Sequence, residues 1–191
     1  MRVVIVQEQK QFVIFVLIDP LDGTQRFVRG YPFISTQIAL MRNGELVLEV
    51  SSAPLFDEMA WAAKGQGAYL NGERLAVSEA AEWPWATLST GNIGSFSRQP
   101  ARWHALGSLV GEVHRIRGYG DFYHYHLLAS GRIDAVVESD VNILDIAANT
   151  VILREAGGVI CDLEGTDIGL DTTSVVAANA VWHTDLLKRF S

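Results

Sequence analysis

The sequence predicts a layered α/β (α+β) fold in a single domain, residues 1–191. Two Asn-Gly pairs in the first half, at residues 43–44 and 71–72, are the strongest short-range signal for β-hairpins. The second half alternates between segments of helical and of strand-like periodicity. The chain length and a hydrophobic content of 49% suit one shared core, with approximate lobes at residues 1–85 and 86–191.

The first lobe is expected to be mainly antiparallel sheet. Residues 12–18 form a short apolar run rich in β-branched and aromatic side chains, which indicates a buried strand. Further strands are expected on either side of each Asn-Gly pair and between the two hairpins, at residues 34–41, 45–50, 56–62, 67–70 and 74–77.

The second lobe is expected to alternate helices and strands. The expected helices lie at residues 101–110, 122–130, 145–156 and 184–190. The expected strands lie at residues 113–116, 133–138, 159–162 and 174–178. The helix at 145–156 is expected to stop at Gly157, because a left-handed C-terminal cap favours glycine.

Composition narrows the class of protein. The chain has 15 Lys and Arg against 22 Asp and Glu, a formal net charge of −7, which argues against binding to a nucleic-acid backbone. The longest apolar run is too short to cross a bilayer, and we expect no secretory signal, because the first residues show no basic segment followed by a small-residue cleavage site. The single cysteine, Cys161, cannot form an internal disulfide and is expected to be buried, so we expect a reducing, cytoplasmic location.

The densest chemistry follows the first buried strand. Residues 19–24 read Asp-Pro-Leu-Asp-Gly-Thr. The carboxylates of Asp19 and Asp22, with the carbonyl of Leu21 between them, can converge on one point, and oxygen ligands suit a hard cation such as Mg²⁺. Gly23 permits close backbone approach, and Thr24 offers a hydroxyl where a helix start could receive a phosphate. The alternative is a plain turn, since Asp, Pro and Gly also favour turns.

Two acidic residues of the second lobe extend this pattern. Asp145 stands where the helix at 145–156 should begin, and it is interpreted either as a further metal ligand or as an N-terminal cap. Glu138 lies at the end of an expected strand, where it is either a site residue or a solvated charge.

Together these segments resemble the inositol monophosphatase family of Mg²⁺-dependent, lithium-sensitive sugar phosphatases. The first motif of the family is similar to residues 19–24, continuing through Phe27 and residues 30–32. Its second motif is similar to Leu-Asp-Ile-Ala-Ala at 144–148 and Glu-Ala-Gly-Gly at 155–158, with Leu144 in place of the usual Trp. Residues 65–72 are also characteristic. Residues 118–122 and 27–30 most resemble the histidinol-phosphate phosphatase branch.

The resemblance implies a layered α-β-α-β-α fold and a metal-dependent hydrolysis of phosphomonoesters. It implies two or three Mg²⁺ ions held by Asp19, Asp22, Asp145 and the Leu21 carbonyl, with inhibition by Li⁺. Thr24 would orient or deprotonate the attacking water together with Asp19, and the backbone amides of Gly23 and Thr24 would hold the phosphate.

The resemblance also implies where the alcohol part of the substrate binds. Asp121, Glu138 and Asp145 stand at the positions that contact it. Asp121 and Glu138 could also pair with a cationic amine or imidazolium, which would suit histidinol phosphate.

The N-terminal region departs from the family pattern. The chain is expected to lack the first helices of the fold, which normally cover one face of the large sheet. An exposed apolar face is therefore expected, and we expect a homo-oligomer, a dimer, to cover it. Glu8 stands at the place of a bridging metal ligand, although its spacing to Asp19 is shorter than usual. Glu8 is therefore interpreted either as a metal ligand or as an exposed charge on a short strand.

Other polar residues are expected to have structural or surface roles. These include all five histidines, of which His124 and His126 should point in different directions from one helix. Arg26, Arg29 and Arg117 are expected on the solvated surface, with substrate or subunit contact as the alternative.

Two classes of function therefore remain open. The first is a phosphatase acting on histidinol phosphate, inositol monophosphate or another small phosphorylated alcohol. The second is a truncated, inactive member that binds phosphate or a protein partner. No nucleic acid and no membrane are expected as partners.

Overall fold

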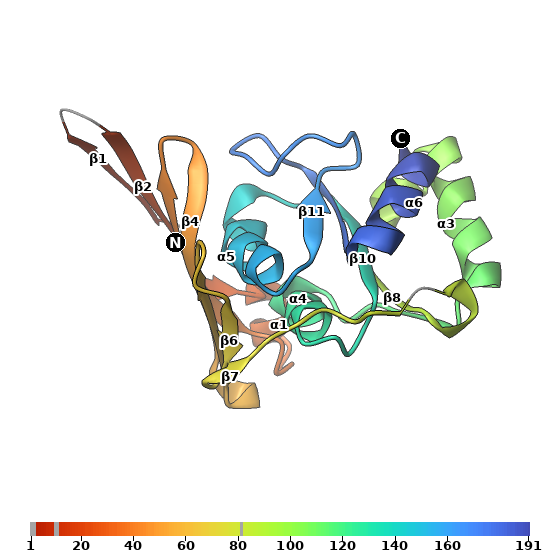
Figure 1. Ribbon diagram of the computed structural model, residues 1–191, viewed down its shortest axis with the longest axis horizontal. Coiled ribbons are helices and arrows are strands. Elements are labelled where there is room, and N and C mark those ends of the chain that lie inside the picture. Colours follow the sequence, from red (N-terminus) through yellow and green to blue (C-terminus); the bar gives the residue numbers. More distant parts are fainter. Residues whose placement is uncertain (1–2, 10–11, 81) are drawn as a thin grey trace.

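Sheets and helices alternate in layers through the molecule (Figure 1). The computed structural model describes residues 3–9, 12–80 and 82–191, with side chains from residue 13 onward. In this part of the chain a seven-stranded sheet, a pair of helices, a five-stranded sheet and a second pair of helices follow one another. This arrangement confirms the layered α+β class.

The seven-stranded sheet is antiparallel throughout and follows chain order. Its strands are β1 (Val3–Gln9), β2 (Phe12–Asp22), β3 (Ser35–Arg42), β4 (Glu45–Ala53), β5 (Glu58–Ala63), β6 (Ala68–Leu70) and β7 (Glu73–Arg74). Both predicted hairpins are confirmed. Asn43 and Gly44 have φ of 52° and 82°, and Asn71 and Gly72 have 51° and 87°, the pair of positive values that a type I′ turn requires.

The predicted strand at residues 74–77 is wrong beyond Arg74. After β7 the chain leaves the sheet, and Leu75 and Val77 pack against the helices between the two sheets. The amide of Val77 donates to the carbonyl of Ala156 instead of to a neighbouring strand. The apolar alternation was correct, but it buries these side chains against helices.

The five-stranded sheet is mixed. Its strands are β8 (Thr87–Gly91), β9 (Arg115–Arg117), β10 (Ala135–Ser139), β11 (Val159–Cys161) and β12 (Ser174–Ala178), in the order β11-β12-β10-β8-β9. β8 was not predicted, because its buried residues include Ser89 and Thr90 and its pattern lacks an apolar run. β8 runs parallel to β10, and its last residue, Gly91, pairs with Glu138.

Helices form the other two layers. α4 (Asp121–Ala129) and α5 (Ile143–Glu155) lie between the sheets, whereas α3 (Pro100–Glu112) and α6 (Ala180–Phe190) pack on the far face of the five-stranded sheet (Figure 1). The described residues also form two short α-helices, α1 (Thr24–Val28) and α2 (Ile93–Phe96), and two 3₁₀ helices, η1 (Pro54–Phe56) and η2 (Trp83–Trp85). None of these helices has the length and apolar character to cross a bilayer.

The ends of α5 show how local sequence sets the site. The helix begins two residues earlier than predicted, because the side chain of Asn142 accepts the amide of Leu144 as the N-terminal cap. It ends at Glu155, with Ala156 as the C-terminal cap, and the glycine predicted to stop it, Gly157, follows with a φ of 88°.

One face of the seven-stranded sheet packs against α4 and α5, and the other is open among the described residues. Cross-strand pairs on the open face carry partly exposed apolar side chains. Leu40 faces Leu48, and Ile38 and Trp61 flank Val50.

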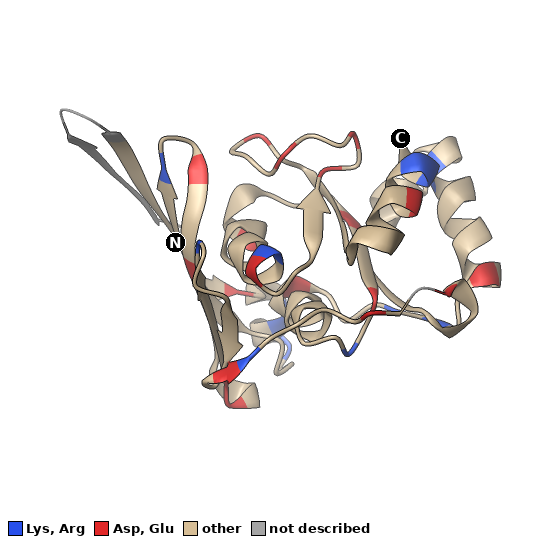
Figure 2. Cartoon of the chain, in the orientation of Figure 1, with Lys and Arg blue, Asp and Glu red and all other residues tan. Residues whose placement is uncertain are grey.

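Figure 2 shows acidic residues spread over both sheets and the helices between them, with Lys and Arg interspersed.

Candidate active site

A β-bulge brings the first two carboxylates to one side of the sheet. Residues three apart in a regular strand point to opposite faces. In β2, however, Asp19 pairs with Gln37 and Asp22 with Ser35, so β2 contains one extra residue in this interval. Both side chains are therefore buried at the same end of the strand, 4% and 6% exposed.

The third carboxylate comes from the first turn of α5. Asp145 is the third residue of that helix, and its Oδ2 accepts the backbone amide of Asn142 at 3.1 Å. This reciprocal capping box fixes the direction of the side chain. The N-terminal cap alternative for Asp145 is thus wrong, because Asn142 has that role.

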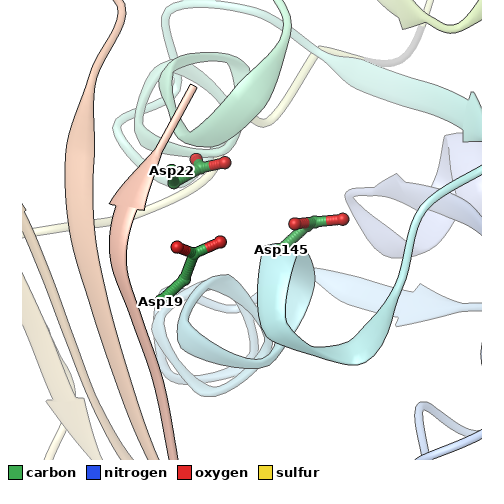
Figure 3. Close-up of side chains that lie close together, drawn as sticks. All are labelled: Asp19, Asp22 and Asp145. Atoms are coloured by element: carbon green, nitrogen blue, oxygen red, sulfur yellow. The ribbon is translucent and has the colours of Figure 1, made fainter. Parts of the chain in front are cut away.

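The three carboxylates face a common space (Figure 3). One oxygen from each of Asp19, Asp22 and Asp145 lies within 4.8 Å of the others. Burial, together with the nearby charges of Asp121, Asp145 and Asp19, raises the pKa of Asp22 to about 8. Buried carboxylates that repel one another in this way, and that offer only oxygen ligands, fit a hard divalent cation.

The loop after Asp19 is held in one conformation. The amide of Leu21 donates to Asp19 Oδ1 at 3.2 Å, and the hydroxyl of Thr24 donates to the Leu21 carbonyl at 2.8 Å. Gly23 has a φ of 81°, and a Cβ there would lie 2.2 Å from the carbonyl oxygen of Phe33, so only glycine fits. α1 begins directly afterwards, and its first amides have no partner within the helix.

A cavity of about 290 Å³ opens beside this cluster. Seven residues that the sequence analysis singled out line it: Leu21, Asp22, Gly23, Thr24, Asp121, Glu138 and Asp145. The structure thus brings together residues from β2, α1, α4, β10 and α5 that are far apart in the chain. The solvated-charge alternative for Glu138 is wrong, since its side chain is buried.

Residues that were not predicted for the site also line the cavity: Gln25, Arg26, Asn92, Tyr125, Val141 and Ile146. Arg26 was expected on the solvated surface, but its Nε lies 2.7 Å from Asp121 Oδ2. Burial raises the pKa of Asp121 to about 6, although the Arg26 guanidinium acts in the opposite direction. The position of Arg26, two residues after Thr24, was the only sequence signal for this contact.

The metal-ligand hypothesis for Glu8 falls on a side chain outside the described residues. The backbone register of β1 pairs Glu8 with Val13, six positions before Asp19 on β2. The role of Glu8 stays a prediction.

The layered α+β fold places three carboxylates that could hold a metal ion beside a cavity, as in a protein that binds a small polar ligand. The model of the inositol monophosphatase family matches residues 6–191, and the chain belongs to this family.

Curated relatives carry phosphatase names. The chain is 38% identical to histidinol-phosphatase of Mycobacterium tuberculosis over 180 residues, which covers 92% of this chain and 68% of the relative. It is 34% identical to fructose-1,6-bisphosphatase/inositol-1-monophosphatase of Thermotoga maritima over 173 residues, which covers 90% of this chain and 66% of the relative. The chain thus spans about two thirds of the length of these relatives.

Solved structures share the fold. The extragenic suppressor protein SuhB from Bartonella henselae superposes with a TM-score of 0.84 at 30% identity, covering 93% of this chain and 70% of that one. The inositol monophosphatase of Thermotoga maritima gives a TM-score of 0.82 at 34% identity, covering 92% and 67%.

Proposed function

We propose that this chain is a Mg²⁺-dependent phosphomonoesterase that hydrolyses a small phosphorylated alcohol, such as histidinol phosphate or inositol monophosphate. The observation that carries the proposal is the convergence of Asp19, Asp22 and Asp145 beside a cavity that is also lined by Asp121 and Glu138. Similarity to relatives named histidinol-phosphatase and inositol-1-monophosphatase supports both the reaction and these substrates.

Some residues of the site are proposed to bind the metal ions, and others to bind the phosphate group and the attacking water. Asp19, Asp22, Asp145 and the Leu21 carbonyl would hold the metal ions. When bound, Mg²⁺ supplies the positive charge that neutralises the phosphate and activates a water molecule. Thr24, with Asp19, would orient the attacking water, and the amides of Gly23 and Thr24 would bind phosphate oxygens at the start of α1.

Asp121, Glu138 and Asp145 would contact the alcohol part of the substrate. The cavity carries more carboxylates than cations, which favours hydroxyl donors or a substrate cation. No Ser, Cys or His nucleophile is needed for this chemistry.

The exposed apolar face and the free thiol bear on the oligomeric state and the cellular location of the protein. We propose a homodimer, supported by the partly exposed apolar side chains of Leu48, Val50 and Trp61 on the open face of the large sheet. A cytoplasmic location is supported by the buried free thiol of Cys161.

Phosphate release from histidinol phosphate and inositol 1-phosphate, with and without Mg²⁺, tests the proposal. Asp145→Asn should abolish Mg²⁺-dependent turnover. Asp171→Asn, the same change at an exposed position, should leave it intact. Li⁺ should inhibit. A folded protein that gains thermal stability with Mg²⁺ but releases no phosphate from either ester would overturn the proposal in favour of a binding module.

A further inference from the structure

Helix α4 carries two buried histidines that contact opposite sheets. His124 and His126 are 0% and 2% exposed, and they point in different directions, as the sequence predicted. His126 contacts the seven-stranded sheet, with Nδ1 at 2.9 Å from Glu58 Oε2 and Nε2 at 2.7 Å from Ser51 Oγ. Neither partner lines the cavity beside the carboxylate cluster, so His126 serves to fix α4 on that sheet.

His124 has the same kinds of partner on the five-stranded sheet, but one of them belongs to the site. Its Nδ1 lies 3.3 Å from Ser89 Oγ on β8, and its Nε2 lies 3.1 Å from Glu138 Oε2 on β10. The contact with Glu138 is short but poorly aligned for a hydrogen bond, so its effect is mainly electrostatic. In a region from which water is excluded, such a contact acts with little screening.

The hydrogen bonds around Ser89 allow the proton of the neutral His124 ring to lie on Nε2. The amide of Tyr119 donates to Ser89 Oγ at 3.4 Å, and the Ser89 hydroxyl proton can be given to His124 Nδ1, 3.3 Å away. In that arrangement Nδ1 accepts, and the N–H of Nε2 faces the Glu138 carboxylate.

Two further features hold the Glu138 carboxylate in place. The Tyr125 hydroxyl donates to the same Oε2 at 3.1 Å. On the neighbouring strand, a Cβ at Gly91 would lie 2.0 Å from Glu138 Oε1, so only a glycine leaves room for this rotamer. Among the described residues, the printed side-chain contacts of this carboxylate all go to Oε2, and Glu138 lines the cavity.

We propose that His124 is a positioning residue for substrate recognition, acting through Glu138. Tyr125 and His124, which Ser89 holds in place, fix Oε2 from the protein side, so that Oε1 meets a hydroxyl or amine of the leaving alcohol. The inference rests on the proposed phosphatase function and adds a residue that does not touch the substrate. It predicts that loss of His124 weakens binding of alcohols that contact Glu138 and spares esters that lack such a group.

Steady-state kinetics with two esters separates these effects. Inositol 1-phosphate offers hydroxyls to Glu138, whereas phenyl phosphate offers none. His124→Leu should raise KM for inositol 1-phosphate about tenfold, because a substrate hydroxyl would lose the free energy of about one hydrogen bond to the charged Glu138 carboxylate. The same variant should change kcat/KM for phenyl phosphate less than about twofold. His124→Gln, which keeps an N–H donor, should restore KM to within about threefold of the wild type.

His126→Leu is the matched control, because it removes an equally buried histidine from the same helix. It should lower the melting temperature and affect both esters equally. Glu138→Gln should raise KM for inositol 1-phosphate, and adding His124→Leu to it should raise KM no further, since the two residues act as a unit. The imidazole ¹⁵N spectrum should show His124 protonated at Nε2, with a shift of that signal in Glu138→Gln.

The outcomes distinguish the two proposals. A wild-type protein that hydrolyses neither ester with Mg²⁺ overturns the proposed function and, with it, the role of His124. If the wild type hydrolyses both esters but His124→Leu changes them equally, as His126→Leu does, only the positioning role is overturned. Additive effects of His124→Leu and Glu138→Gln would also overturn it.

Discussion

The hydroxyl of Thr24 donates a 2.8 Å hydrogen bond to the carbonyl oxygen of Leu21. This bond closes the turn that contains Asp22 and Gly23 and holds the hydroxyl beside Leu21, one of the proposed metal ligands. Thr24→Val should therefore lower kcat by about 100-fold, the usual contribution of a group that assists proton transfer. Thr24→Ser keeps the hydroxyl and should retain most of the activity, as steady-state phosphate release at saturating Mg²⁺ would show.

The same loop supplies a control. The hydroxyl of Thr36 donates to the carbonyl oxygen of Pro20 at 3.0 Å, one residue from Leu21. Thr36→Val removes a comparable hydrogen bond and should change kcat less than about threefold. Equal losses in Thr24→Val and Thr36→Val would mean that Thr24 only stabilises the loop.

Arg26 and Asp121 should set the charge preference of the cavity in opposite directions. The guanidinium of Arg26 pairs with the Asp121 carboxylate at 2.7 Å, so a substrate cation must compete with it. Arg26→Gln should raise the ratio of kcat/KM for histidinol phosphate to that for inositol 1-phosphate by about three- to tenfold. Asp121→Asn should lower this ratio by a similar factor.

Competition kinetics with the two esters measures the ratio directly. Arg29→Gln serves as the control, because Arg29 is exposed and does not line the cavity. If Arg26→Gln and Asp121→Asn move the ratio in the same direction, the ion pair does not control substrate charge.

Glu49 should make stability depend on pH. Its carboxyl is completely buried in β4, where Oε2 accepts the amides of Val151 and Ile152 from α5. Burial raises the pKa of Glu49 well above its usual value of 4.5. The folded state therefore keeps a proton that the unfolded chain loses above pH 4.5. The free energy of unfolding should then fall as the pH rises from the unfolded-state pKa toward the folded-state pKa, with a slope of about 1 kcal/mol per pH unit.

Glu49→Gln removes this titration, so the stability of the variant relative to the wild type should rise as the pH rises above the unfolded-state pKa of Glu49. Urea unfolding at a series of pH values measures the difference. Glu73→Gln, a change at an exposed position, should run parallel to the wild type. If the difference in stability between the wild type and Glu49→Gln does not vary with pH, Glu49 has the same ionisation in the folded and unfolded states.

Local sequence predicted what depends on local chemistry. The two Asn-Gly turns, the glycine that ends α5 and the clustering of residues 19–24 follow from backbone conformation and residue type. The convergence of Asp145 with Asp19 joins segments that are far apart in the chain, so spacing alone could not predict it, and only the resemblance to the family implied it.

The contacts that complete the site could not be predicted in this way. β8 was missed because its pattern is polar, and with it the sheet partner Gly91, which leaves room for Glu138. Arg26 was expected on the solvated surface, with substrate or subunit contact as the alternative, and its contact with Asp121 was not predicted. Such contacts join residues that are 13 to more than 90 positions apart, and only the packed layers bring them together.

Glu155 illustrates a motif residue whose role is structural. Its Oε1 and Oε2 accept the amides of Gly65 and Gly67, each at 2.7 Å, and so tie the end of α5 to the turn after β5. Both segments resemble family motifs, yet neither lines the cavity beside Asp145. Glu155→Ala should therefore lower the free energy of unfolding by about 2 kcal/mol, because two hydrogen bonds to a charged acceptor are lost. It should leave kcat and KM within about twofold of the wild type.

Chemical denaturation and phosphate release, measured on the same preparation, test this separation. Glu155→Gln keeps one acceptor oxygen and should lose about half as much stability as Glu155→Ala. Arg154→Gln, at the neighbouring position on the surface, should cost less than about 1 kcal/mol, since its partner Asp167 is exposed. A large loss of kcat in Glu155→Ala without a loss of stability would instead connect this turn to Asp145 through α5, the helix that the two residues share.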